Sequence, residues 1–254
     1  MEEKDIKVQS LYKSLKVLEC FNATTPELGV TEISNMLGIY KSNVHNILTT
    51  YESLGYILKN PQTLKYSLSN KMLEYSYVIT SQLNYQNVVY QVMKRLTESV
   101  NEMSYFGLAH GNYVLYMFNA YPKLYDNNYP IRSIMGEKAE MYCTSIGKAM
   151  LLTMPEEEII SRLPKERVKY TENTLIDLKE ILKDIEESAQ RGYSIDNSEH
   201  EEGIRCVGVP VVDRNHKLWG GLSISGSARK FTDKKVESFA KELMDAAFEI
   251  RSRL

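Results

Sequence analysis

The chain has 254 residues, of which 43% are hydrophobic and 25% are charged, a composition typical of one large globular domain or two smaller ones. The formal net charge of −2 and the pI near 6.2 argue against a protein that coats nucleic acid or anionic membranes through bulk charge, so any contact with DNA must be local. Three widely spaced cysteines, an acidic start and the lack of a long apolar stretch argue against a disulfide framework, a signal peptide and a membrane span, which predicts a cytoplasmic protein.

Three helices are predicted in the first 54 residues. Apolar residues at helical spacing over 11–21 predict the first helix, which the segment 22–29 interrupts. The second helix is expected to start at Thr31 as its N-cap and to stop at Gly38, which can take the positive φ of a tight turn. The third is predicted over 41–54. This order is typical of a helix-turn-helix.

The third helix combines an apolar stripe with a polar face. Most side chains on that face are short and can hydrogen-bond to base edges and phosphates. The predicted DNA contacts on this helix are Lys41, Ser42, Asn43, His45, Asn46 and Thr49. Two strands at 56–59 and 64–68 around a turn predict a wing, in which Lys59 and Lys65 are placed to contact phosphates.

A winged helix can also bind another protein, and charge does not separate the two possibilities over the whole segment. Residues 1–70 carry equal numbers of basic and acidic side chains. Between 33 and 70, however, Lys41, Lys59 and Lys65 are opposed by Glu52 alone, so the predicted reading surface is mildly basic. We therefore predict a DNA-binding winged helix-turn-helix domain over 1–69.

A linker helix is predicted over 70–84. Its apolar and aromatic residues cover more than one face, which an exposed connector would not need. It should therefore pack against either the second domain or a partner chain, and a dimer would suit a regulator that reads paired half-sites.

Residues 85–254 are predicted to form an α+β domain with a mostly antiparallel sheet flanked by helices. The expected strands are 103–109, 113–120, 192–196, 207–212 and 217–225, and the expected helices are 86–100, 145–153, 155–162, 178–191 and one from a Thr232 cap to the C-terminus. Asp177 and Gly192 are the expected cap and stop of the helix over 178–191.

Several residues could carry chemistry, and each also has a structural interpretation. Ser145 and Lys148 have the Ser-x-x-Lys spacing of a nucleophile beside a lysine, but the companion motifs are missing, which favours a simple helix start. Cys143 and Cys206 lack a recognisable histidine partner and are interpreted as buried thiols. The segment 199–202 could bind a metal but is interpreted as a solvated acidic loop.

Small polar side chains at the ends of the predicted elements suggest a ligand pocket. Ser223 and Ser225 lie two apart on one strand and therefore point together, and Asp196 and Cys206 lie on neighbouring strands or their edges. Ser145 opens a helix whose free N–H groups would favour an anion such as a carboxylate. No catalytic base is evident, so this pocket is predicted to sense a compact polar ligand.

The chain resembles the IclR family of bacterial transcription regulators from about residue 8 to its end. The resemblance rests on several motifs in one order, which is more specific than any single motif. They are SLxxxLxVL at 10–18, LGIYKSNVH at 37–45, LGY at 54–56, CTSIGKA at 143–149, RGYSID at 191–196, GIRCV at 203–207 and LSISG at 222–226.

The resemblance implies a winged helix-turn-helix, a linker helix and a GAF-like effector domain, assembled as a homodimer or homotetramer that binds double-stranded operator DNA. It also implies a small organic acid or aromatic metabolite as effector, and a lid around 131–136. The family's effector pocket maps here onto Ile131, Ser145, Ile146, Asp196, Cys206, Ser223 and Ser225. Two departures are Asn46, where the family often has arginine, and Tyr142, where it commonly has histidine.

The hypothesis that follows is a ligand-responsive transcription regulator, favoured to be a repressor, with no catalytic residue, metal or cofactor. One alternative is a small-molecule enzyme that uses Ser145 with Lys148, or Cys206, beside an N-terminal module that does not bind DNA. Another is a metal sensor that uses Cys206 and His200.

Overall fold

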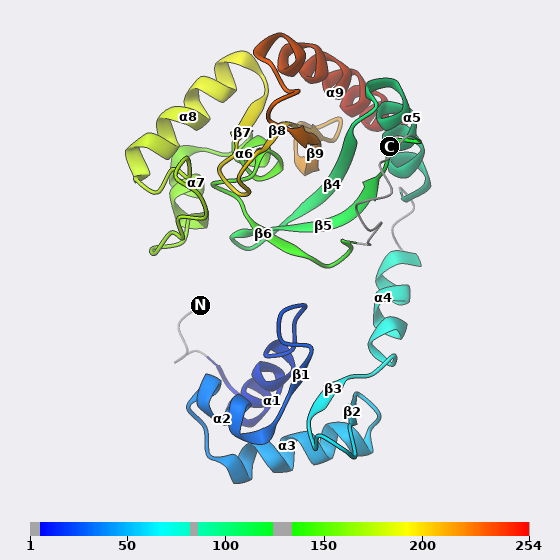
Figure 1. The fold of residues 1–254 in the computed structure, drawn as a ribbon, viewed down its shortest axis with the longest axis vertical. Coiled ribbons are helices and arrows are strands. Elements are labelled where there is room, and N and C mark those ends of the chain that lie inside the picture. Colours follow the sequence, from blue (N-terminus) through cyan, green and yellow to red (C-terminus); the bar gives the residue numbers. More distant parts are fainter. Residues whose placement is uncertain (1–5, 82–85, 124–133, 254) are drawn as a thin grey trace. The chain divides into compact units, whose positions relative to one another are not determined.

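The computed structural model describes residues 6–81, 86–123 and 134–253 (Figure 1). The chain divides into two compact units, Met1–Asn84 and Tyr85–Leu254. The finer division into 1–69, 70–84 and 85–254 stays a prediction.

The N-terminal unit is a winged helix-turn-helix. Three of its described helices share a core with a small antiparallel sheet, which has the strand order β1-β3-β2. The elements are α1 (Gln9–Glu19), β1 (Glu27–Leu28), α2 (Val30–Leu37), α3 (Lys41–Ser53), β2 (Ile57–Lys59), β3 (Tyr66–Leu68) and α4 (Met72–Ser81). Their common core consists of Val17, Cys20, Phe21, Leu28, Ile33, Val44, Leu48, Ile57 and Tyr66.

Two local features differ from the expectation. Helix α2 starts at Val30 rather than after Thr31, because Gly29 takes the extended N-cap position and donates its N–H to Glu32 Oε2 at 2.7 Å. Leu28 lies in the short strand β1, opposite Tyr66 of β3, within a segment that sequence reasoning treated only as a break. Gly38 has φ +65° and ends α2 as predicted.

The C-terminal unit is an α+β domain built on a six-stranded antiparallel sheet, in the order β6-β5-β4-β9-β8-β7. The strands are β4 (Met103–His110), β5 (Tyr113–Ala120), β6 (Lys138–Glu140), β7 (Ser194–Asn197), β8 (Ile204–Val212) and β9 (Leu218–Ser227). The helices are α5 (Gln86–Val100), α6 (Ser145–Leu151), α7 (Glu156–Arg162), α8 (Leu178–Arg191) and α9 (Asp233–Arg253). Strand β6 is absent from the predicted set because it is only three residues long.

Helix α6 lies inside the curve of the sheet, while α5 and α9 pack together on the outside (Figure 1). Two glycines allow α6 to approach. A Cβ atom at Gly208 would lie 2.5 Å from the Ser145 carbonyl oxygen, and one at Gly221 would lie 2.8 Å from the Ile146 side chain. All seven residues of α6 are buried as a result.

The two predicted ends of α8 are confirmed. Asp177 accepts hydrogen bonds from the N–H groups of Lys179 and Glu180, and Gly192 closes the helix with φ +84°. Helix α8 buries Ile181 and Ile185 in the core of the C-terminal unit.

Leu48→Ala should destabilise the N-terminal unit by about 2–5 kcal/mol, because it leaves a cavity beneath the fully buried Leu48 of α3. Urea unfolding followed by far-UV circular dichroism measures the change. The neighbouring exposed Thr49→Ala should leave the free energy of unfolding within about 0.5 kcal/mol of the parent value. Equal losses in the two variants would contradict this account of the core.

Candidate functional site

Helix α3 presents a polar, exposed face. Val44 and Leu48 anchor its other side in the core. The six side chains predicted to contact DNA are all exposed: Lys41, Ser42, Asn43, His45, Asn46 and Thr49. The structure therefore places them together on one accessible helix, and their role in DNA contact stays a prediction.

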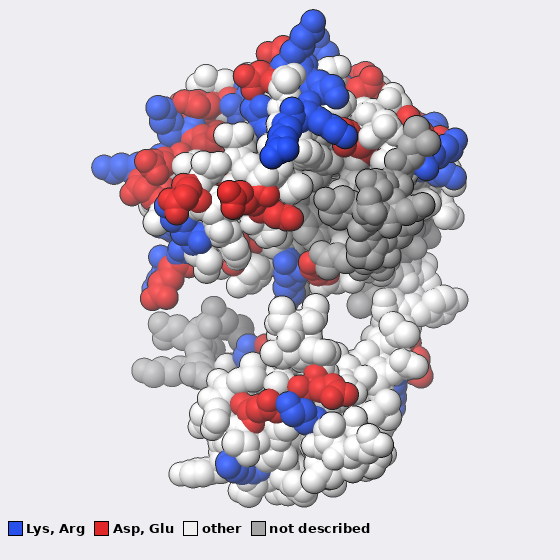
Figure 2. Space-filling view, viewed as in Figure 1, with Lys and Arg blue, Asp and Glu red and all other residues white. Residues whose placement is uncertain are grey.

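The two wing lysines lie in different surroundings. Lys59 is exposed, with its Nζ 5.4 Å from the centre of the Tyr66 ring. Lys65 Nζ forms a 2.9 Å ion pair with Glu32 Oε1, which offsets its charge. The hydrogen bond from the Gly29 N–H lowers the pKa of Glu32 most, and the hydrogen bond from Lys65 lowers it further. On the face of this unit visible in Figure 2, uncharged residues form most of the surface, with a few acidic and basic side chains among them.

A cavity of about 150 Å³ lies in the C-terminal unit, between the inner face of the sheet and the start of α6. It is lined by Tyr105, Tyr116, Tyr121, Ile134, Glu137, Thr144, Ser145, Ile146, Asp196, His200, Glu201, Ile204, Cys206, Ser223 and Ser225. Six of the seven predicted pocket residues are in this set. The seventh, Ile131, lies outside the described residues.

Strand register explains why these residues meet. Asp196 of β7 lies opposite Cys206 of β8, which lies opposite Ser225 of β9. On the other side of β9, Ser223 lies opposite Tyr105 of β4. Sequence reasoning missed Tyr105 because its place depends on the β4–β9 pairing, which joins segments far apart in the chain.

Burial controls the protonation of the cavity lining. It raises the pKa of Asp196 to about 7, even though the Glu199 N–H donates to the carboxylate at 2.7 Å. Burial also raises the pKa of Cys206 well above its usual value, and the thiol donates to Ser225 Oγ at 3.1 Å. Cys206 is therefore a protonated thiol, which argues against its use as a nucleophile.

The segment 199–202 is only in part the solvated acidic loop that the sequence suggested: Glu201 and Glu202 are exposed, but Glu199 and His200 are not. Glu199 is only 5% exposed, and its carboxylate pairs with Lys148. His200 packs on the Tyr170 ring, and burial lowers the pKa of its imidazole. The interpretation was wrong for Glu199 because its buried partner lies 51 residues earlier in the chain.

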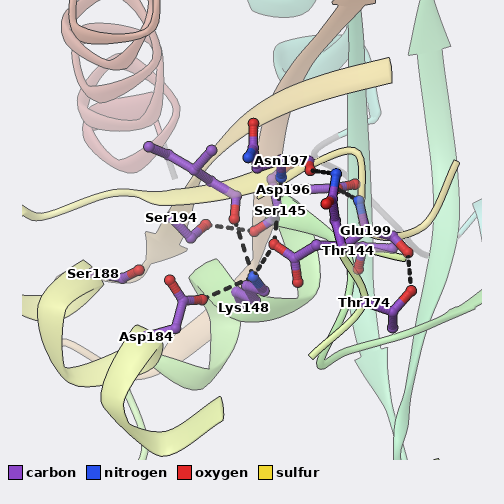
Figure 3. Close-up of polar contacts among 12 residues, drawn as sticks. Thr144, Ser145, Lys148, Thr174, Asp184, Ser188, Ser194, Asp196, Asn197 and Glu199 are labelled. Atoms are coloured by element: carbon purple, nitrogen blue, oxygen red, sulfur yellow. Dashed lines mark hydrogen bonds and ion pairs between the residues drawn. The ribbon is translucent and has the colours of Figure 1, made fainter. Parts of the chain in front are cut away.

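Lys148 does not face Ser145 as a general base. Its Nζ lies between Glu199 Oε1 at 2.5 Å and Asp184 Oδ2 at 2.8 Å, and it also donates to the Ile195 carbonyl (Figure 3). Burial by itself lowers the pKa of Lys148, but the two carboxylates outweigh it, so that the pKa lies above its usual value. A permanently protonated lysine cannot accept a proton from a serine.

Tyr142, at the position where the family commonly has histidine, is a buried core residue and its hydroxyl donates to the Val168 carbonyl at 2.7 Å. It is not part of the cavity lining. Within the described residues, no group of three or more His, Cys, Asp or Glu side chains is arranged to hold a metal ion. In the same part of the chain, no helix is long and apolar enough to cross a membrane.

Known family models match both units of the chain. The IclR helix-turn-helix domain model matches residues 10–61, and the model of the C-terminal domain of bacterial transcriptional regulator IclR matches residues 78–252. The chain belongs to the IclR family. The IclR-family relatives are transcription regulators rather than enzymes, which removes the basis for the Ser145/Lys148 enzyme alternative.

Full-length relatives support this assignment. The HTH-type transcriptional regulator KdgR of Escherichia coli strain K12 is 29% identical over 252 residues, covering 97% of this chain and 93% of that protein. The regulator XynR of the same organism is 27% identical over 248 residues, covering 97% of each chain.

Solved structures share the fold. The IclR protein of Thermotoga maritima matches with a TM-score of 0.69 and 29% identity, covering 96% of this chain and 98% of that chain. An IclR homologue of Microbacterium hydrocarbonoxydans, solved with 4-hydroxybenzoate, matches with a TM-score of 0.75 and 19% identity, covering 96% and 98% of the two chains.

The raised pKa of Asp196 should appear in the pH dependence of stability. From about pH 4 to pH 7 the folded protein holds a proton on Asp196 that the unfolded chain has lost. This group therefore makes the free energy of unfolding fall as the pH rises through that window, by at most about 1.4 kcal/mol per pH unit. Asp196→Asn should remove this slope.

Urea unfolding at several pH values between about 4.5 and 7.5 measures the effect, with Glu202→Gln as the control because this exposed side chain does not line the cavity. Glu202→Gln should keep the pH dependence of the parent protein. If Asp196→Asn kept it as well, Asp196 would not be the group that holds the proton.

Proposed function

We propose that this IclR-family protein is a cytoplasmic repressor that binds operator DNA through α3 and the wing, and that a small molecule in the cavity changes this binding. The observation that carries the proposal is the exposed polar face of α3, with core residues anchoring the opposite side of the helix. Asn43 and Asn46 can hydrogen-bond to base edges, and Asn46 suits adenine. Lys41, Lys59 and Lys65 can contact phosphates.

The proposed effector is a small organic acid or aromatic metabolite that binds in the cavity lined by Ser145, Asp196 and Cys206. The described lining contains three carboxyl side chains and no Lys or Arg, so a carboxylate ligand would rely on hydroxyl donors and on a protonated Asp196. The segment 131–136 is the proposed lid, of which Ile134 contributes to the described lining.

DNA binding tests the proposal directly. The purified protein should bind its own upstream intergenic DNA, against scrambled competitor at about 150 mM salt, where non-specific binding is largely suppressed. Asn43→Ala and Asn46→Ala should each cost about 1–3 kcal/mol at the preferred site and change the sequence preference. Lys41→Ala should weaken binding similarly for all sequences and reduce the salt slope by about 1.

Equal losses on all sequences from the two asparagine variants would reject their assignment as base readers. A panel of hydroxy acids and aromatic acids, including 4-hydroxybenzoate, added to the DNA complex then tests the effector. Folded protein that shows no sequence preference either with or without the panel would reject the proposed function.

We also propose that α4 forms part of the interface of a homodimer, which could pair further into a homotetramer. None of the residues of α4 is buried, and the apolar Leu73, Tyr77, Val78 and Ile79 are all more than half exposed. Apolar side chains exposed together on one helix favour burial against a partner.

Tyr77→Glu should weaken association by roughly tenfold or more, because it would bury an unpaired charge in the interface. Sedimentation velocity over a range of protein concentrations measures this change. Glu74→Gln on the same helix is the matched control, since it adds no charge. An unchanged association constant for Tyr77→Glu would place the interface elsewhere.

A further inference from the structure

A buried ion cluster lies directly behind the cavity. Lys148 of α6 is 1% exposed, and its Nζ contacts the carboxylates of Glu199 and Asp184 and the Ile195 carbonyl (Figure 3). The cluster joins three elements: α6, α8 and the loop between β7 and β8. None of its three charged side chains lines the cavity itself.

Stability alone is a weak reason for such a cluster. Moving a lysine and a carboxylate out of water is costly, and apolar residues of similar volume often serve a fold equally well. Asp184 is partly accessible, and its other oxygen lies 3.8 Å from Arg191. The contact that is buried on both sides is therefore the one between Lys148 and Glu199.

In the loop between β7 and β8, the bonded residue Glu199 directly precedes residues that line the cavity. Glu199 is followed by His200 and Glu201, which both line the cavity. The Glu199 N–H donates to the cavity residue Asp196, and its Oε1 also accepts from the Asn197 N–H. A shift of Glu199 would thus move the loop residues of the cavity and the hydrogen bond that orients Asp196.

On the helix side, the bond is equally close to the cavity. Lys148 lies one turn after Thr144 and Ser145, which line the cavity. The loop has further attachments. The hydroxyls of Thr171 and Thr174 donate to the carbonyls of Ser198 and Glu199, the Asn173 side-chain amide donates to the Asn197 carbonyl, and the Ala228 N–H donates to the Gly203 carbonyl. Ser198 has φ +59°, a backbone conformation that surrounding contacts must hold in place.

We propose that Lys148 and Glu199 are positioning residues for the cavity: the buried hydrogen bond from the Lys148 ammonium to Glu199 holds the loop 197–203 against α6 and thereby sets the shape of the cavity wall. The inference rests on the proposed function of the cavity as the effector site, but the geometry it describes can be tested without DNA or effector. It gives the Ser-x-x-Lys segment a mechanical role in place of a catalytic one.

A matched pair of variants at Glu199 tests the proposal in the full chain. Glu199→Gln keeps an oxygen that accepts from Lys148, whereas Glu199→Met has a similar volume and no acceptor. In both variants Lys148 keeps its ion pair with Asp184, so no unpaired charge is created. Lys148→Met/Glu199→Met is a second variant that replaces the whole pair by apolar groups.

Two measurements report how firmly the loop 197–203 is held. Hydrogen exchange should be about tenfold faster or more over 197–203 in both methionine variants, and near the parent rate in Glu199→Gln. Alkylation by iodoacetamide should accelerate by a similar factor at the cavity residue Cys206, while the buried Cys143 and the amides of α9 serve as internal controls.

Faster loop exchange with unchanged thermal unfolding and unchanged controls would support positioning. Parent-like exchange and alkylation in the methionine variants would overturn it. Acceleration everywhere, including α9 and Cys143, would also overturn it, since the pair would then serve global stability. Because neither readout uses DNA, a failure of the proposed regulator function would appear separately, in the DNA-binding assay.

Discussion

The close approach of α6 to the inner face of the sheet is the constraint on which the C-terminal unit depends. Gly208 and Gly221 leave no side chain where the first turn of the helix meets β8 and β9. The helix can therefore bring Ser145 and Ile146 to the cavity and bury Lys148 behind it. A bulkier residue at either glycine would have to push the helix away from both the cavity and the ion cluster.

Burial of that lysine explains the charges nearby. A buried ammonium group requires a partner in the interior, and Glu199 and Asp184 supply it from two different elements. Asp196 lies beside this cluster without a direct bond to Lys148, and burial leaves it half protonated near neutral pH. An ion pair behind the cavity thus accompanies Asp196 in its wall, a carboxyl group that changes its charge near neutral pH.

The N-terminal unit follows a different principle. Its helices are held by a small apolar core, and α3 exposes the side opposite that core. With Lys65 paired to Glu32, little positive charge remains for long-range attraction to DNA. In the proposed DNA complex, such a surface would use close hydrogen bonds from short side chains and the two copies of the proposed dimer, since electrostatic affinity grows with the number of phosphates contacted.

Local sequence determined most of the architecture. Periodicity, caps and glycine stops predicted α3, α8 and the β4–β5 hairpin, because these signals act between residues near one another in the chain. Placement on predicted strands and at a helix start likewise led to Ser145, Asp196, Cys206 and the two serines of β9, and the family resemblance added Ile146. Strand β6 was missed because three residues carry too little periodicity, and the cap of α2 was misplaced because glycine has no side chain to signal it.

Only the tertiary structure decided which distant residues meet. Tyr105 reaches the cavity through its pairing with β9, and Glu199 is buried because Lys148 needs a counter-charge. In the sequence, Glu199 is simply the first of several charged residues in a row. Burial and pairing between segments about 50 or more residues apart are properties of the packed fold, and no local pattern encodes them.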